Sequence, residues 1–380
     1  MASDPADPLL DFTLDLYKQL LIENKGKANI LFSPFSVAAA LSMTLAGARH
    51  HTAEQIERTM HLKGATAHKY FADILPKIEG YAPNVTLQLA NRLYSDELIR
   101  VLPAYTSLLA ESYKTTMKSV DFQNHWDASR RQINAWVQEV TRSRIKDLFP
   151  EGSMDTFTAL VIVNAIYFKG PWNSPFDPED THTEKFHETE ERSKTVNMMH
   201  KEAKFRMNNC NVHNVSVLEI PYKGKNTSMV ILLPKKIDGL SALEKMLTPS
   251  ALKEILNGLV HKTTVVLSLP SFKLEQTTNL KKTLQAMGIH DLFLKQSDLS
   301  GISDRKNLRV STAVHKAFVE VNEEGTEAAA ASDFIVEQLS AAILPSFTVD
   351  HPFLFVIRSR DPDIILFMGS VRHVDSAGTL

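Results

Sequence analysis

Hydrophobic residues in the first 150 or so positions recur at helical spacing. In the first predicted helix, Leu9, Phe12, Leu16 and Leu20 form an apolar stripe along one face. A second helix is predicted at Val37–Leu45, with Ser36 as its cap, and it has so many apolar side chains that it should be buried. Further helices are predicted at Thr52–Met60, Ala67–Ile78, Pro103–Tyr113 and Trp126–Arg142.

From about residue 157 the pattern becomes typical of strands. The β-rich run Phe157–Phe168 predicts a strand buried on both faces. Val215–Ile220 and Thr227–Leu233 flank a polar turn and predict a hairpin. Other strands are predicted at Val85–Tyr94, Thr264–Leu269, Leu308–Val321, Phe353–Arg358 and Ile364–Phe367, and helices at Leu240–Gly258 and Asn279–Met287. This interleaving predicts one α+β domain, residues 1–380, around a large sheet.

Composition argues against nucleic-acid-binding, disulfide-rich and membrane proteins. At 380 residues and 43% hydrophobic content, the chain can bury a large core, and its net charge of -2 gives no general reason to expect a nucleic-acid partner. A single cysteine, Cys210, excludes an internal disulfide framework. No apolar run approaches the length of a membrane span, so no membrane partner is expected.

Catalytic and cofactor motifs are missing from the sequence. There is no Gly-x-Ser-x-Gly nucleophile elbow, no phosphate-binding glycine loop and no His-Glu-x-x-His zinc pair. His182 and His187 lie near several carboxylates, but no third ligand has suitable spacing, so a solvated acidic loop is the favoured interpretation. Cys210 has no evident partner base. We therefore expect no enzyme activity, no cofactor and no metal.

Residues 321–346 have an unusual pattern, because two glutamates and a glycine lead into four consecutive alanines. If this segment were an extended strand, one of its faces would carry only small or apolar residues: Thr326, Ala328, Ala330, Ser332, Phe334 and Val336. Glu327, Asp333 and Glu337 would fall on the other face. Composition alone would also allow disorder, but this alternation favours a connection that can insert into a sheet as a strand.

The stretch Glu323–Ala331 resembles the hinge of an inhibitory serpin, and other motifs resemble the same family in the same order along the chain. Those motifs are Asn29–Ser36, Asn164–Trp172, Asp298–Gly301, His315–Phe318, His351–Phe355 and Phe367–Gly369. Within the family the nearest resemblance is to arthropod, tick-like inhibitors.

The resemblance implies a serpin fold of three β-sheets and about nine helices, with an exposed reactive-centre loop at about residues 323–346. It also implies a suicide-substrate mechanism. The partner is then a serine protease, which is trapped as a covalent acyl-enzyme when the cleaved loop inserts into the main sheet of a metastable, monomeric inhibitor.

Counting 17 residues from Glu323, the family pattern implies a reactive bond between Leu339 and Ser340. Counted back from Pro352, the bond would follow Ala341, and Ile343–Leu344 is a third alternative. Leucine or alanine before the bond predicts chymotrypsin-like or elastase-like targets, such as chymotrypsin, cathepsin G, chymase or elastase.

The resemblance also assigns roles in the main sheet. The hinge would comprise Glu323, Gly325, Thr326, Ala328, Ala329, Ala330 and Ala331. The shutter, which holds the central strands together, would comprise Phe32, Ser33, Ser36, Asn164 and His315, and the breach, where insertion begins, Trp172 and Glu323. The usual lysine partner of the hinge glutamate is replaced by Ser271, with Lys273 as a substitute two residues further on.

Two other hypotheses remain open. A non-inhibitory serpin, acting as a carrier or chaperone, would usually carry bulky or charged hinge residues, which this chain lacks. A heparin-regulated inhibitor has weak support, because Lys69 and Lys77 are too sparse for a glycosaminoglycan site. Three sequons, at Asn84, Asn214 and Asn226, are weak support for a secreted glycoprotein. The cytoplasm is the alternative, since no signal peptide precedes the first helix.

Overall fold

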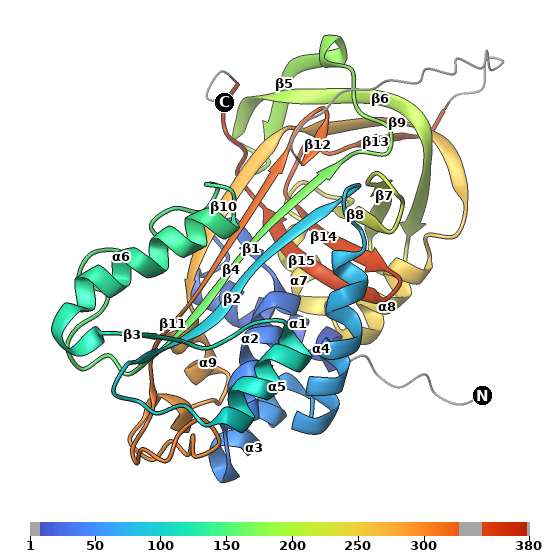
Figure 1. Ribbon diagram of the computed structural model, residues 1–380. Helices are drawn as coiled ribbons and strands as arrows, with labels where there is room; N and C mark the ends of the chain where they lie inside the picture. The colour runs from blue at the N-terminus through green and yellow to red at the C-terminus, as the bar shows by residue number, and fades with distance from the viewer. Residues whose placement is uncertain (1–7, 327–343, 378–380) are drawn as a thin grey trace, which may run out of the picture.

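The computed structural model describes residues 8–326 and 344–377, which form two hydrogen-bonded sheets flanked by helices (Figure 1). The helices are α1 (Pro8–Glu23), α2 (Pro34–Gly47), α3 (His50–Met60), α4 (Gly64–Glu79), α5 (Pro103–Tyr113), α6 (Phe122–Val140), α7 (Leu240–Met246), α8 (Pro249–Asn257) and α9 (Leu280–Ala286). Short 3-10 turns lie at Pro178–Asp180 and Asp291–Phe293.

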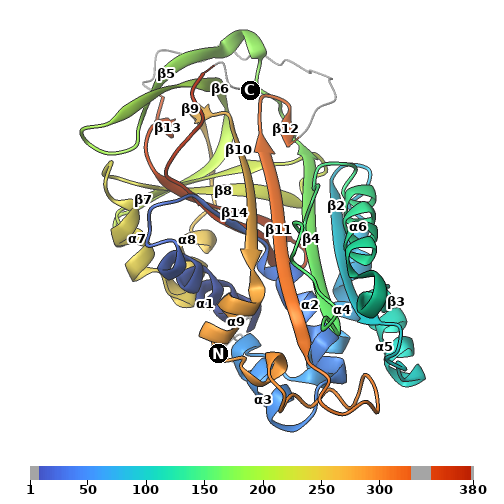
Figure 2. The same ribbon diagram turned by 90° about the vertical axis from the view of Figure 1, so that its left-hand side faces the viewer.

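The six-stranded sheet contains the long central strands. Its order is β10-β11-β4-β2-β3, and β12 pairs with β4 off this path (Figure 2). Its strands are β2 (Thr86–Asp96), β3 (Lys118–Val120), β4 (Leu160–Pro171), β10 (Phe272–Asn279), β11 (Val310–Val321) and β12 (Gly325–Thr326). Strands β4 and β11 are neighbours and run parallel, whereas β4 is antiparallel to β2.

Strand β4 is buried on both faces, as its sequence predicts. Ile162 and Ile166 face the main hydrophobic core, while Val161 and Val163 pack in a second core with residues of α6. The strand begins three residues later than predicted, at Leu160. Alternating apolar residues therefore fill both sides of this strand, and α6 forms the layer on its outer face.

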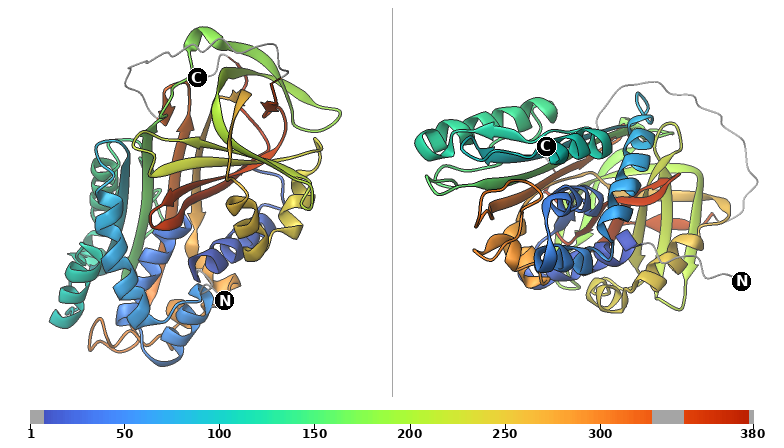
Figure 3. Two further views of the ribbon diagram at one scale, coloured as in Figure 1. Left: turned by 90° about the vertical axis from the view of Figure 1, so that its right-hand side faces the viewer. Right: turned by 60° about the horizontal axis from the view of Figure 1, so that its bottom comes forward.

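The nine-stranded sheet has the order β1-β15-β14-β8-β7-β6-β9-β13, with β5 beside β6. Its strands are β1 (Ile30–Phe32), β5 (Thr181–His187), β6 (Ser193–Cys210), β7 (Val215–Pro221), β8 (Thr227–Pro234), β9 (Lys262–Pro270), β13 (Ser346–Thr348), β14 (Phe353–Arg360) and β15 (Asp363–Val371). The long strand β6 joins two groups, since it pairs with β5 and β9 along most of its length and with β7 at its end. The described strands therefore form two hydrogen-bonded sheets where the family resemblance implied three, because β6 joins β5, β9 and β13 to β7, β8, β14, β15 and β1 (Figure 3).

Several local predictions were wrong. His182 and His187 lie in strand β5, not in an acidic loop, because β5 pairs with β6 over seven residues. The single helix predicted at Leu240–Gly258 is two helices, and the second begins where Thr248 caps a turn started by Pro249.

The cap of helix α2 was also misplaced. Ser33, not Ser36, is the N-cap residue, and its side chain accepts a hydrogen bond from the Ser36 backbone N–H at 3.1 Å. Pro34 at the first helical position starts the helix three residues earlier than the apolar pattern suggests. Ser36 therefore lies inside the first turn, where its hydroxyl is available for the contacts described below.

Candidate functional site

The segment that follows β11 makes a tight turn before it returns to the sheet. The backbone N–H of Asn322 donates to the carbonyl of Gly325 at 3.0 Å, and the Asn322 side-chain oxygen accepts from the N–H groups of Glu324 and Gly325 at 3.2 Å. Residues 325 and 326 then form β12, antiparallel to the end of β4, with Gly325 opposite Pro171 and Thr326 opposite Gly170. The predicted hinge thus already contacts the strand beside which it would insert.

Gly325 is required by this close approach. Its φ of +130° is a conformation that other residues rarely adopt, and a Cβ atom there would lie 2.4 Å from the Gly170 carbonyl oxygen and 2.5 Å from the Trp172 nitrogen. Both neighbours are backbone atoms of the β4 end, so they cannot move aside as a side chain could. The hinge sequence needs glycine here for a steric reason.

Trp172 holds the base of this turn. Its indole N–H donates to the Asn322 carbonyl at 2.9 Å, and its backbone N–H donates to the Glu324 carbonyl at 2.8 Å. The ring is 2% exposed and stacks on Tyr222, with centroids 4.6 Å apart and planes 10° apart. The turn is therefore fastened to an aromatic cluster at the top of β4.

Glu323 bonds to a hydroxyl group rather than to a lysine. Its carboxylate accepts a hydrogen bond from the Thr181 Oγ1 hydroxyl at 2.7 Å, and its carbonyl accepts from the Phe176 N–H at 2.7 Å. The Lys273 ammonium, which the sequence offered as a partner, lies over the Phe318 ring at 5.2 Å from its centroid. Neither strand β5 nor its threonine was predicted, so this contact could not be foreseen.

The residues predicted to form the shutter meet in the middle of the six-stranded sheet. Asn164 of β4 lies directly opposite His315 of β11. The Asn164 amide nitrogen donates to the Ser36 carbonyl at 2.7 Å and to the Ser36 hydroxyl at 2.9 Å, while its oxygen accepts from the His315 ring. The network thus ties the start of α2 to both central strands.

His315 is a neutral histidine in this arrangement. Its Nδ1 faces the Asn164 side-chain oxygen, which can only accept, so Nδ1 carries the proton. Its Nε2 then accepts the Ser33 backbone N–H at 3.1 Å. The ring is 1% exposed. Desolvation by burial lowers the pKa of His315 to about 3, so both hydrogen bonds persist at neutral pH.

Asn91 also belongs to this network, and Gln276 bonds to the neighbouring strand β1; the sequence analysis missed both. The Asn91 side-chain oxygen on β2 accepts from Asn164 at 2.7 Å and from the Ser36 hydroxyl at 3.0 Å. The Gln276 side chain on β10 accepts from the Leu31 N–H at 2.6 Å. Asn91 lies opposite Asn164 in the β2–β4 register, so correct pairing of these strands would have revealed it. Phe32, a predicted shutter residue, is fully buried and stacks with Tyr17.

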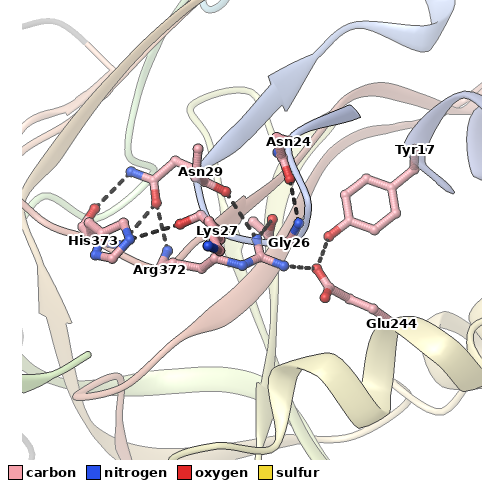
Figure 4. A network of polar contacts seen from close by, with 10 residues as sticks. Tyr17, Asn24, Gly26, Lys27, Asn29, Glu244, Arg372 and His373 are labelled. Atoms are coloured by element: carbon pink, nitrogen blue, oxygen red, sulfur yellow. Dashed lines mark hydrogen bonds and ion pairs between the residues drawn. The ribbon is translucent and has the colours of Figure 1, made fainter. Parts of the chain in front are cut away.

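The carboxyl-terminal strands have their own anchor (Figure 4). Glu244 of α7 accepts hydrogen bonds from the Tyr17 hydroxyl of α1 and from Arg372, both at 2.5 Å. Burial next to this carboxylate raises the pKa of Tyr17, which stays a hydrogen-bond donor. The Asn29 side chain accepts from the N–H groups of Arg372 and His373. The end of β15 is therefore fixed to both α1 and α7.

The reactive bond itself lies outside the described residues. This holds for Leu339, Ser340 and Ala341, and for hinge residues Ala328, Ala329, Ala330 and Ala331. The chain is described again from Leu344, and β13 pairs with β9 from Ser346. The segment 327–343 is thus bounded by β12 on the six-stranded sheet and by β13 on the nine-stranded sheet.

The three sequon asparagines are exposed, which is a condition for glycosylation. Asn214 lies in the turn between β6 and β7, Asn226 in the turn between β7 and β8, and Asn84 just before β2. Within residues 8–326 and 344–377, no helix is long and apolar enough to cross a membrane.

Comparisons with known proteins agree with this architecture. The family model "Serpin (serine protease inhibitor)" matches residues 8–374. The chain is 50% identical to Ipis-1 of the tick Ixodes persulcatus, over 98% of this chain and 100% of that one. It is 40% identical to the leukocyte elastase inhibitor of Bos taurus, over 94% and 96% of the two chains.

Among solved structures, the fold matches uncleaved ovalbumin with a TM-score of 0.87 and 32% identity, over 97% of this chain and 99% of that one. The tick relative and the serpin fold confirm the resemblance seen in the sequence. The name of the family also agrees with the prediction that the chain is no enzyme. This chain belongs to the serpin family of serine protease inhibitors.

Proposed function

We propose that this serpin traps serine proteases by the suicide-substrate mechanism, in which the cleaved loop inserts between β4 and β11. One observation carries the proposal: residues 325 and 326 already pair with β4 antiparallel, in the orientation that an inserted strand would have. The loop needs no change of direction to continue down β4, only the separation of β11 from β4.

Continuing the register of Gly325 and Thr326 gives each loop residue a partner on β4. Ala328 would lie opposite Phe168 and Ala330 opposite Ile166, and the positions further on follow in steps of two. The complete set on this face pairs Ser332 with Asn164, Phe334 with Ile162 and Val336 with Leu160. Directly opposite residues share a face of the sheet, and Phe168, Ile166, Ile162 and Leu160 belong to the main core.

This register suits the loop sequence. Its small and apolar residues would enter the main core, and Ser332 would bring a hydroxyl group to Asn164. On the opposite face, Glu327 would lie beside Lys169, and opposite charges on neighbouring strands attract. The acidic side chains of Asp333, opposite Val163, and of Glu337, opposite Ala159, would have apolar neighbours. Insertion in this register therefore gives most of the loop residues a suitable neighbour and leaves these two carboxylates without one.

Insertion must break the shutter contacts. The hydrogen bond between His315 and Asn164 joins the two strands that have to separate. In the closed sheet it stabilises the uninserted form, and an inserted Ser332 could replace His315 as the neighbour of Asn164. The native protein is then held by a barrier rather than by being the most stable form of the chain.

For the reactive bond we propose Leu339–Ser340. An apolar, medium-sized leucine fits the slot of chymotrypsin-like and elastase-like proteases, whereas a trypsin-like pocket would keep its buried carboxylate unpaired. The name of the bovine relative, leukocyte elastase inhibitor, supports this target class. A bond after Ala341 would instead favour elastase-like enzymes over chymotrypsin-like ones.

The direct test is incubation with a panel of serine proteases. We expect a complex with chymotrypsin, cathepsin G, chymase or elastase that survives denaturing electrophoresis, and a released peptide that begins at Ser340. Leu339→Arg should move the inhibition to trypsin, while Ala341→Arg, the matched control, should not. Cleavage by every protease without a stable complex would contradict the proposal and favour a non-inhibitory carrier or chaperone.

Secretion and glycosylation are part of the proposal. Exposed Asn84, Asn214 and Asn226 support it. Expression in arthropod cells from the complete gene checks this part: the protein should appear in the medium and shrink on treatment with an N-glycosidase. Unmodified protein retained in the cells would favour the cytoplasm.

A further inference from the structure

Three arginines surround one buried carboxylate on the nine-stranded sheet. Glu219 of β7 is 2% exposed and forms ion pairs with Arg206 of β6 at 3.2 Å, with Arg358 of β14 at 3.2 Å and with Arg360, also of β14. Ser228 donates a further hydrogen bond to it at 2.7 Å. We name Arg206, Arg358 and Arg360 the arginine cluster.

The cluster holds more positive charge than Glu219 can neutralise. Arg358 is the buried partner, since its side chain is 7% exposed, and its Nε has no hydrogen-bond partner among the described residues. Although burial alone would raise the pKa of Glu219, the bonds from Ser228, Arg358 and Arg360 hold it below its ordinary value. One arginine would be enough to balance the carboxylate, so two positive charges remain in excess.

The two extra guanidinium groups lie side by side at the surface. Arg206 Nη1 and Arg360 Nη2 both contact the same oxygen of Glu219. Each of these side chains is 34% exposed, so both reach the solvent. Two cations that share one oxygen repel each other, and a second anion between them would relieve that repulsion.

Neighbouring residues add to the positive charge. Lys262 of β9 is exposed and lies directly opposite Arg206, on the same face of the sheet. The N–H of Arg360 donates to the Asn226 carbonyl, which places Arg360 beside the turn that carries exposed Lys225. Two opposing charges also lie near Arg360: exposed Asp363 is its register partner, and exposed Asp361 is the next residue along the chain.

We propose that Arg206, Arg360 and Lys262 bind a tetrahedral oxyanion, the sulfate or phosphate group of an ester. Guanidinium groups donate in a planar fork that matches such oxygens. Arg206 uses one nitrogen on Glu219 and Arg360 uses two, so each guanidinium retains further N–H donors. The site lies on β6, β9 and β14, apart from the hinge, and it is independent of the proposed inhibition.

Binding is measured on the intact, unglycosylated protein by calorimetry and by the thermal midpoint. Inorganic sulfate and inorganic phosphate are the first probes, followed by a sulfated pentasaccharide and inositol hexakisphosphate. We expect a midpoint that rises with ligand concentration, as binding to the folded state requires. A preference for the saccharide or for the inositol phosphate identifies which ester the site takes, and equal binding identifies a general oxyanion site.

Matched variants locate the site. Arg206→Gln leaves Arg358 and Arg360 on Glu219, and Lys262→Gln replaces an exposed residue at the start of β9, so each should fold and lower affinity about tenfold. Arg131→Gln on α6 removes the same charge from an arginine that is 69% exposed and should change affinity less than twofold. No binding to any of the four probes, or an equal loss in all three variants, would overturn the proposal.

Discussion

The two edges of strand β11 differ in how far they pair with the neighbouring strand. Towards β10, pairing runs through the end of the strand, from Asn279 opposite Val314 to Phe272 opposite Val321. Towards β4, pairing ends at Phe318 opposite Tyr167. Beyond that point, β4 pairs with β12 instead. Strand β11 is therefore paired to its end on the β10 side, whereas on the β4 side its last residues are unpaired with β4.

This difference indicates where the sheet can part. An entering strand on the β10 side would have to break antiparallel pairs along all of β10. On the β4 side residues 325 and 326 already pair with the end of the strand, and in the proposed insertion the network of His315 and Asn164 would be the first to separate. We therefore expect the sheet to open along the seam between β4 and β11, and the following changes test this.

The largest effect is expected from Thr326→Arg. The register places residue 326 beside Gly170 at the start of insertion, where a charged side chain would have to be buried without a partner at a cost of several kcal/mol. Because 1.4 kcal/mol is a factor of ten, the fraction of protease trapped should fall roughly 100-fold, while cleavage continues.

Ser346→Arg is the control for this variant. Ser346 is exposed on β13, beyond the other end of the loop, and should tolerate arginine without loss of trapping. The measurement is the ratio of stable complex to cleaved inhibitor on a denaturing gel. Undiminished trapping by Thr326→Arg would show that residue 326 does not enter the sheet.

Asn164→Ala should weaken the seam itself. The substitution leaves the buried His315 N–H without its acceptor and removes the bonds to Ser36 and Asn91, which together should cost about 3 kcal/mol. We expect faster opening, seen as a lower thermal midpoint and as polymers after mild heating. Asn209→Ala, at an exposed position of β6, should leave both unchanged. An Asn164→Ala protein as stable as the parent would remove the shutter from the account.

Acid should loosen the same seam. The folded pKa of His315, about 3, lies below its ordinary value of 6.5, so the unfolded chain takes up the proton first as the pH falls. The stabilisation of the folded state by neutral His315 is complete above pH 6.5 and is lost as the pH falls towards 3. Between pH 7.5 and 5.5 the loss should be about 1.4 kcal/mol.

Urea midpoints at these two pH values measure the effect of His315. His315→Asn should flatten the dependence by that amount. His68, whose pKa burial also lowers, remains in both proteins and does not affect the difference. An identical slope in parent and variant would mean that His315 is not held neutral in the closed sheet.

The smallest effect is expected at the hinge glutamate. Thr181→Val removes the hydroxyl that donates to Glu323, a partly exposed contact worth about 1 kcal/mol. Inhibition rates with a fixed protease should change less than tenfold. Lys273→Ala should have no effect on them, and a larger loss from Lys273→Ala than from Thr181→Val would restore the lysine as the partner of Glu323.

The sequence predicted the long elements well and the contacts between them poorly. Strand β4 and helix α5 were recognised because their patterns are continuous and, for α5, because Pro103 marks its start. Strands β5 and β6 were missed because their charged, half-exposed residues lack clear alternation, and strand pairing stabilises them instead.

The candidate site shows the same division. Gly325, Asn164 and His315 were identified through the family resemblance, and they lie where insertion would begin or pass. Asn91 and Thr181 were missed, since each reaches the site only through strand pairing and tertiary contact. Side chains that complete a network from distant strands leave no local signal in the sequence.

The most direct test of insertion is the thermal midpoint before and after cleavage in the loop. Limited proteolysis within residues 327–343 frees one end of the loop while the anchor of Glu244 and Arg372 keeps the carboxyl-terminal strands bound. We predict that cleavage raises the midpoint by tens of degrees, about as much as a new central strand in the six-stranded sheet can add. An unchanged or lower midpoint would contradict insertion between β4 and β11.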